Sequence, residues 1–176
     1  SFAELIDSLR TTLYRILNNR KRATIIVDPE NEYGDLVEEL GGVNIEITSG
    51  GKSHINLFDI DLSYGDNSIS DKEDFILSVI AEMLHKPITS GQRTTIANAV
   101  SEIYEKWQST QNKEDIPTIE DFTNALKKLV DKNKSREDSE ILKAVMYYSD
   151  KSHCTLFRGK SNIDFSNDFI TFNLSK

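Results

Sequence analysis

The chain has 176 residues, which suits one domain, or one domain with a subdomain, and allows a substantial core. Its formal net charge of −8 argues against the whole chain being a nucleic-acid-binding surface, because such surfaces neutralise phosphates with Lys and Arg. A single cysteine, Cys154, excludes an intrachain disulfide and fits a reducing compartment, and no apolar run approaches the roughly 18 residues that span a bilayer.

The first forty residues alternate between helical and extended patterns. Apolar residues at spacings of three and four predict an amphipathic helix over residues 1–20. Residues 23–27 are rich in β-branched side chains without polar alternation, which is typical of a strand buried on both faces. A second helix is expected over residues 35–40, ending at Gly41 and Gly42. This order of elements predicts an α/β fold.

Gly50-Gly51-Lys52-Ser53 matches the second half of the phosphate-loop signature G-x-x-x-x-G-K-[ST]. The first glycine of the signature is replaced by Glu46, whose carboxylate would repel phosphate groups. The alternating residues 54–58 also follow where the signature requires a helix N-terminus. The tetrapeptide is therefore interpreted as the turn of a hairpin between strands at 44–48 and 54–58.

Every element from about residue 70 to residue 148 has the 3.6-residue period of a helix. Ser70 with Glu73, and Thr89 with Gln92, match the capping box that begins a helix. Thr118 is expected to begin a third helix, and apolar residues between 141 and 146 indicate a fourth. Aromatic residues on these stripes are interpreted as core: Phe75, Tyr104, Trp107 and Phe122.

The pattern becomes extended again after residue 149. Residues 155–157 read as extended, Gly159 as a turn, and residues 168–174 as a strand. No helix follows to cover that strand, which predicts that the sequence is a segment of a longer protein. We therefore expect a partial α/β core at 1–69, an all-helical insertion subdomain at 70–148, and strands returning to the core at 149–176.

Three carboxylates, Asp28, Glu30 and Glu32, follow the strand at 23–27. Open α/β sheets bind ligands at the carboxyl ends of their strands, where such a group could hold magnesium-bound waters or polarise a nucleophile. An Asp before Pro29 is also a common turn opener, and the two glutamates would also favour the N-terminus of the next helix. The residues alone leave both interpretations open.

The remaining candidates carry weaker signals. His153 and Cys154 are adjacent, so on a strand they would point to opposite faces and could not form a Cys–His dyad. The histidines show no metal-ligand spacing, so no metal site is predicted. One basic cluster is more typical of a solvated helix end than of a phosphate contact, and consists of Arg15, Arg20, Lys21 and Arg22.

Five segments resemble, in order, the middle of the ATPases that power conjugative type IV secretion, especially those of Gram-positive conjugative elements. They are IIVDPENEYGDLVEELGG, SGGKSHINLFDI, DKEDFILSVIAEML, IPTIEDFTNALKKL and CTLFRGKSNIDFSNDFITFNLS, and they extend over residues 23–176. A strand followed by D-P-E-x-E-Y recurs in the wider FtsK/HerA branch of RecA-like motor proteins. I-N-L-F-D-I is similar to the I-N-P-x-D-I of the narrower family, with Leu57 in place of proline.

The resemblance implies a partial RecA-like P-loop NTPase core with an all-helical insertion. In the family the phosphate loop, Walker A, lies about one helix upstream of D-P-E-x-E-Y, and Walker B lies downstream of the strand that matches residues 168–174. This chain contains neither motif, although Ser1-Phe2 could be the end of a phosphate loop. Asp28, Glu30 and Glu32 match the family motif and would lie on the edge of the nucleotide site, whereas no catalytic residue or metal ligand carries over.

The favoured hypothesis is a segment of a motor ATPase that couples ATP hydrolysis to DNA or protein transfer. ATP and Mg²⁺ would serve the whole protein, while the segment alone would be inactive, bind neither, and be a monomer or dimer. Other secretion subunits and further copies would be its partners, at the cytoplasmic face of the membrane. The alternative is a helical protein–protein interaction module without catalytic activity. A third reading is a free-standing hydrolase that uses Asp28, Glu30 and Glu32 on a small phosphorylated substrate.

Overall fold

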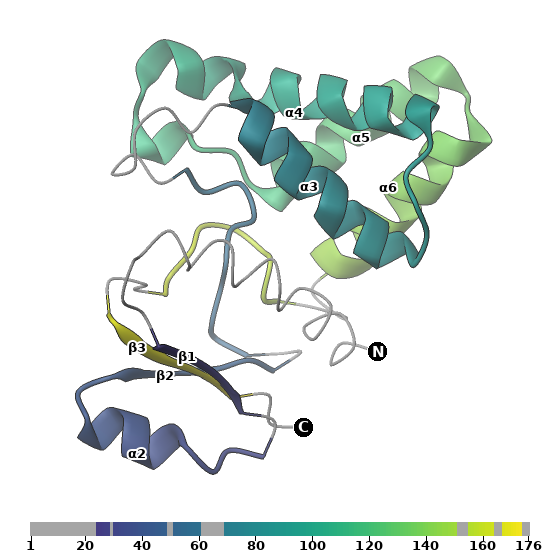
Figure 1. The fold of residues 1–176 in the computed structure, drawn as a ribbon. Coiled ribbons are helices and arrows are strands. Elements are labelled where there is room, and N and C mark those ends of the chain that lie inside the picture. The colour runs from purple at the N-terminus through teal and green to yellow at the C-terminus, as the bar shows by residue number, and fades with distance from the viewer. Residues whose placement is uncertain are drawn as a thin grey trace.

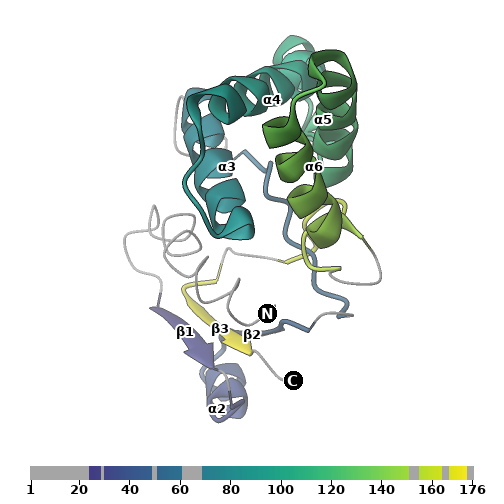
Figure 2. The same ribbon diagram turned by 90° about the vertical axis from the view of Figure 1, so that its right-hand side faces the viewer.

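The computed structural model describes residues 24–28, 30–48, 51–60, 69–150, 155–163 and 167–173. Three parallel strands form a sheet on one side of the molecule, and four long helices lie on the other side (Figure 1). A short helix covers the face of the sheet that points away from the four helices (Figures 1 and 2). The three-part division at residues 69 and 148 stays a prediction.

The sheet contains β1 (Thr24–Asp28), β2 (Val43–Glu46) and β3 (Phe169–Asn173) in the order β1-β3-β2. The last strand of the chain therefore lies between two strands from its beginning. Ile170 and Phe172 of β3 are buried on one face, and Thr171 and Asn173 are buried on the other. The expected burial of both faces of β1 is wrong for its described side chains, because β1 lies at an edge of the described sheet and its Ile26 and Val27 are only half-buried.

The helix α2 (Gly34–Glu39) connects β1 to β2 close to the predicted position. Leu40 ends it, and Gly41 follows with φ of +78°, a left-handed conformation that glycine adopts without a Cβ penalty. Gly34 and Val37 are its buried residues. The helix is therefore attached to the sheet by a narrow face only.

Four long helices follow: α3 (Ile69–Leu84), α4 (Ser90–Thr110), α5 (Ile119–Asn133) and α6 (Arg136–Ser149), with a 3₁₀ turn η2 (Lys113–Asp115) before α5. Thr89 and Gln92 form the predicted capping box of α4, and Thr118 caps α5 with Asp121. Ser70 does not cap α3, because the helix already includes Ile69, whose side chain packs against the core. No helix of the described part of the chain is long and apolar enough to cross a membrane.

The loop before α3 inserts an aromatic side chain into the helical core. Phe58 is 1% exposed, and its ring centroid lies 5.3 Å from that of Phe122. The hydroxyl of Tyr104 donates a 2.6 Å hydrogen bond to the carbonyl oxygen of Phe58. Burial raises the pKa of this hydroxyl, and Asp59 raises it further, so it remains a donor. The predicted core role of Tyr104 and Phe122 is confirmed.

The predicted hairpin is wrong. β2 pairs with β3 in parallel, and residues 54–58 form no strand. Ile55 instead donates its N–H to the carbonyl oxygen of Leu156 at 2.7 Å, and the N–H of His54 donates to Oδ1 of Asn162 at 2.7 Å. Residues 155–157, expected to be extended, begin a turn that the N–H of Arg158 closes on Thr155. The hydrogen-bond partners of His54 and Ile55 are about a hundred residues away in the sequence, and a local alternation of residues does not reveal such partners.

Asn56, which is 3% exposed, joins three parts of the chain through its side chain and its backbone N–H. Its Nδ2 donates to the carbonyl oxygen of Pro117 at 2.8 Å and to Asp59 at 3.1 Å. Its Oδ1 accepts the N–H of Phe58, and its own backbone N–H donates to Oγ of Ser161 at 2.7 Å. The loop before α3, the start of α5 and the C-terminal segment are therefore held at one point.

We expect Asn56→Ala to lower the free energy of unfolding by about 2–3 kcal/mol, because it leaves a buried N–H and a buried carbonyl without partners. Urea denaturation monitored by circular dichroism measures this change. Asn124→Ala, at an exposed position of α5, is the matched control and should shift stability by less than about 0.5 kcal/mol. Equal stability of the two variants would contradict the assigned role.

Candidate functional site

The carboxyl ends of the three strands bring polar residues from distant parts of the sequence into one row. Asp28 of β1 and Glu46 of β2 are both register partners of Asn173 on β3. Register partners on adjacent strands share a face, so the three side chains lie on the same face at the same edge of the sheet. Open α/β sheets bind ligands at this edge. The row is therefore the candidate functional site.

Asp28 is buried, with 2% of its surface exposed, and its carboxylate holds the following loop. Oδ1 accepts the N–H of Glu32 at 3.1 Å, and Oδ2 accepts the N–H of Tyr33 at 2.8 Å. Burial alone would raise the pKa of this carboxyl, but the backbone N–H groups of Tyr33 and Glu32 stabilise the charged form and lower the pKa below its ordinary value. Asp28 is therefore a charged residue that positions the loop.

The other two predicted site residues, Glu30 and Glu32, are exposed. Asn31 lies between them with φ of +57°, a left-handed conformation that Asn tolerates better than most residues. The structure therefore separates the three carboxylates into one that binds its own loop and two that face solvent. Within the described ranges no group of three His, Cys, Asp or Glu residues could hold a metal ion.

A second row next to the first contains two polar residues that were not predicted from the sequence. Asn44 of β2 is the register partner of Thr171 on β3, and the third position, on β1, is the apolar Ile26. Oδ1 of Asn44 and Oγ1 of Thr171 are buried without a hydrogen-bond partner among the described residues. An unpaired buried polar group costs about 1–3 kcal/mol, so hydrogen bonds among the described residues do not account for this row. The pairing of Asn44 with Thr171 follows from the strand order, which the sequence does not state.

The helix α2 lies close against this polar face because two glycines allow the approach. A Cβ on Gly34 would lie 2.4 Å from Nδ2 of Asn44. A Cβ on Gly42 would lie 2.5 Å from Cγ1 of Val37 and 2.7 Å from the carbonyl oxygen of Phe169. The backbone of β3 cannot move away as a side chain can, so Gly42 sets the distance between α2 and the sheet.

Gly51, Lys52 and Ser53 do not form a phosphate loop in the described part of the segment. The N–H of Gly51 donates to the carbonyl oxygen of Thr48, and the carbonyl oxygen of Lys52 accepts from Asn162. Residues 54–60 contain no helix, as the sequence predicts. A phosphate loop requires a helix N-terminus at this point.

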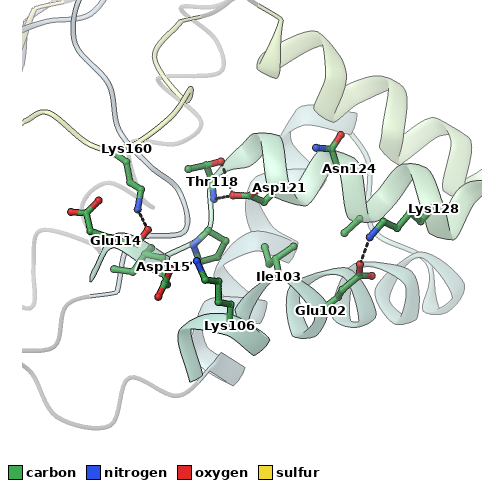
Figure 3. A pocket seen from close by; sticks show the side chains of 13 residues that line it. Glu102, Ile103, Lys106, Glu114, Asp115, Thr118, Asp121, Asn124, Lys128 and Lys160 are labelled. Carbon is green, nitrogen blue, oxygen red and sulfur yellow. Dashed lines mark hydrogen bonds and ion pairs between the residues drawn. The ribbon is translucent and has the colours of Figure 1, made fainter. Parts of the chain in front are cut away.

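A groove of about 450 Å³ lies between α4, η2 and α5 (Figure 3). Its lysines are bound to neighbouring groups: Lys106 pairs with Asp115, Lys128 pairs with Glu102 at 2.7 Å, and Lys160 donates to the carbonyl oxygen of Glu114 at 2.6 Å. Two of these lysines are therefore paired with carboxylates and the third with a backbone carbonyl, so the groove offers a ligand no strong positive charge. The prediction that the helical segment is an interaction module is not tested by these contacts.

Several sequence candidates lie outside the described residues. These are Ser1, Phe2, Arg15, Arg20, Lys21, Arg22, Gly50, His153 and Cys154.

Comparisons with known proteins agree on the kind of domain. A family model described as the central domain of the helicase HerA matches residues 8–171. The solved structure of VirB4 of Thermoanaerobacter pseudethanolicus matches with a TM-score of 0.67 and 19% sequence identity, over 94% of this chain and 64% of that chain. No match was found among curated proteins. The structural match confirms the predicted fold class, α/β with a partial RecA-like core.

We expect Asp28→Asn to lower stability at neutral pH, because the amide replaces an anion that accepts two N–H groups. An Asp with a lowered folded pKa stabilises the fold above its unfolded pKa, near 3.9, and loses this contribution as the pH falls through the folded pKa. The difference in urea midpoint between wild type and variant should therefore shrink between about pH 5 and pH 2. Asp35→Asn, at an exposed carboxyl of α2, is the control. A difference that stays constant with pH would contradict the role of Asp28.

We expect Gly42→Ala to destabilise the fold by about 1–3 kcal/mol, because the added Cβ collides with the backbone of β3. Gly91→Ala in α4 is the matched control, because a Cβ there meets nothing closer than 3.7 Å. In a helix that change should be neutral or stabilising by up to about 1 kcal/mol. Thermal unfolding followed by circular dichroism compares the two variants, and a stable Gly42→Ala protein would refute the close packing of α2.

Proposed function

The chain belongs to the family of HerA helicase central domains, and we propose that it is a segment of a motor ATPase of type IV secretion. In this proposal the whole protein couples ATP hydrolysis to the transfer of DNA or protein. The observation that carries the proposal is the family match over residues 8–171. The family match agrees with the FtsK/HerA branch that D-P-E-x-E-Y predicts, and the fold shared with VirB4 supports the narrower assignment.

We propose that the loop after β1 lies on the edge of the nucleotide site. Asp28 acts there as a positioning residue, because its carboxylate binds the N–H groups of Glu32 and Tyr33. Glu30 and Glu32 are exposed at the carboxyl end of the sheet, where a ligand of an α/β fold would lie. These two glutamates would face the bound nucleotide and its waters.

The described residues do not fit a complete site for ATP and Mg²⁺. Both oxygens of Asp28 accept backbone N–H groups, and residues 51–60 do not form a phosphate loop. We therefore propose that other segments of a longer protein hold the phosphates and the metal ion. The chain spans 64% of the length of the VirB4 chain that it matches. Alone, it is not expected to hydrolyse ATP.

Phosphoryl transfer depends mainly on positioning and electrostatics, so the proposed contribution of this chain is rigidity. The central strand β3 is buried on both faces, and the Asp28 carboxylate holds the loop beside it. Further copies of the protein and other secretion subunits would be its partners. We propose a cytoplasmic location at the inner face of the membrane.

The proposal is tested by ATP hydrolysis and calorimetric binding, with this chain and a longer protein that includes Walker A and Walker B. Only the longer protein should bind and hydrolyse ATP. Asp28→Asn in the longer protein should lower kcat by about 10- to 100-fold, because a displaced loop misplaces reacting groups. Glu105→Gln, at an exposed site on α4, should have no effect.

Hydrolysis by the 176-residue chain alone, abolished by Glu30→Ala or Glu32→Ala, would instead support the free-standing hydrolase. A longer protein that binds no nucleotide would refute the ATPase assignment.

A further inference from the structure

The helix α2 and the residues at its two ends expose large apolar side chains to solvent. Tyr33, Leu36 and Leu40 are 46%, 49% and 65% exposed. They account for three of the five large hydrophobic side chains that are exposed among the described residues. We call these three residues the α2 stripe.

The α2 stripe continues the buried face of the helix. At 3.6 residues per turn, Leu36, Leu40, Tyr33 and Val37 fall within an arc of about 100°, which is the width of an apolar face that packs against a partner. Val37 is 0% exposed and packs beside Gly42, whereas the side chains of the other three residues are exposed to solvent. The sheet therefore covers only one side of this apolar face.

The segment that carries the α2 stripe is rich in carboxylates and contains no cation between Arg22 and Lys52. Residues 23–51 contain no Lys and no Arg. Their acidic residues are Asp28, Glu30, Glu32, Asp35, Glu38, Glu39 and Glu46. By helical geometry, Glu39 lies next to Leu36 on the side of the stripe away from Val37, and the exposed Glu32 precedes Tyr33 in the loop that leads into the helix. The surface is therefore apolar at its centre and negative along one side.

We propose that the α2 stripe docks an amphipathic helix of another protein, in which an apolar stripe is flanked by Lys and Arg. Charge complementarity selects this occupant, because its basic residues would meet Glu39 and the other carboxylates of this segment while its apolar residues cover Leu36 and Leu40. Nucleic acids and anionic membrane surfaces would be repelled by the same carboxylates. A second copy of this surface would bring like charges together.

The α2 stripe lies apart from the four long helices but beside the loop after β1. The helix α2 is on the face of the sheet opposite to α3, α4, α5 and α6 (Figures 1 and 2). The exposed glutamates of the loop after β1 lie at its N-terminal end, so a docked helix would also be next to the candidate functional site. The docking proposal does not depend on ATP hydrolysis.

The test uses a fluorescein-labelled helical peptide of about 18 residues, five turns, with leucines along one face and lysines along the others. Fluorescence anisotropy measures its affinity for the 176-residue chain. Leu36→Ser and Leu40→Ser should each weaken binding by about tenfold or more. Met146→Ser, at a residue of α6 that is 42% exposed, should leave the affinity unchanged.

A pair of charge substitutions distinguishes the effect of the carboxylate beside the α2 stripe from the effect of the net charge of the protein. Glu39→Lys and Glu105→Lys change the net charge equally, and Glu105 is exposed on α4. Only Glu39→Lys should weaken binding by about tenfold, and the affinity should fall as salt is added. A peptide with glutamate in place of lysine should not bind. The melting temperature of each variant confirms that it is folded.

Three results would overturn the proposal. The first is that the wild-type chain does not bind the basic peptide. The second is that Met146→Ser and Glu105→Lys weaken binding as much as the substitutions on α2. The third is a dimer in sedimentation velocity experiments that Leu36→Ser dissociates, which would make the occupant a second copy of the chain.

Discussion

The rest of the structure depends on the parallel pairing of β3 between β1 and β2. Parallel strands cannot be joined by a tight turn, so a crossover must carry the chain from one end of the sheet back to the other. Here the crossover between β2 and β3 contains α3, α4, α5 and α6. The same pairing sets the register in which Asp28, Glu46 and Asn173 share one row. The helical part and the candidate site therefore follow from one strand pairing.

Polar contacts anchor this long crossover to the sheet side of the molecule. Asn56 binds Phe58 in the loop before α3, Pro117 ahead of α5 and Ser161 in the C-terminal segment. Phe58 follows two residues later and fills the helical core beside Phe122. The apolar contact supplies stabilisation, whereas the hydrogen bonds specify which segments meet, because a buried polar group tolerates few alternative partners.

The two faces of α2 differ in what they contact. Gly34 and Val37 bring it against the polar rows of the sheet, where Asn44 and Thr171 lie. Its outer apolar residues and the surrounding carboxylates form a surface that the sheet does not use. The loop held by Asp28 joins the two, so a partner on α2 would act beside the residues assigned to the nucleotide edge.

The sequence by itself determined the features that depend on neighbours a few residues apart. The capping box of Thr89, the start of α5 after Thr118, the end of α2 just before Gly41 and the core position of Tyr104 were all predicted, because helix ends and helical faces are local. Only the tertiary structure decided the pairing of β2, the contact of Ile55 with Leu156 and the polar rows across the sheet. Those features join residues about a hundred positions apart, and a strand pattern does not state which strand it will pair with.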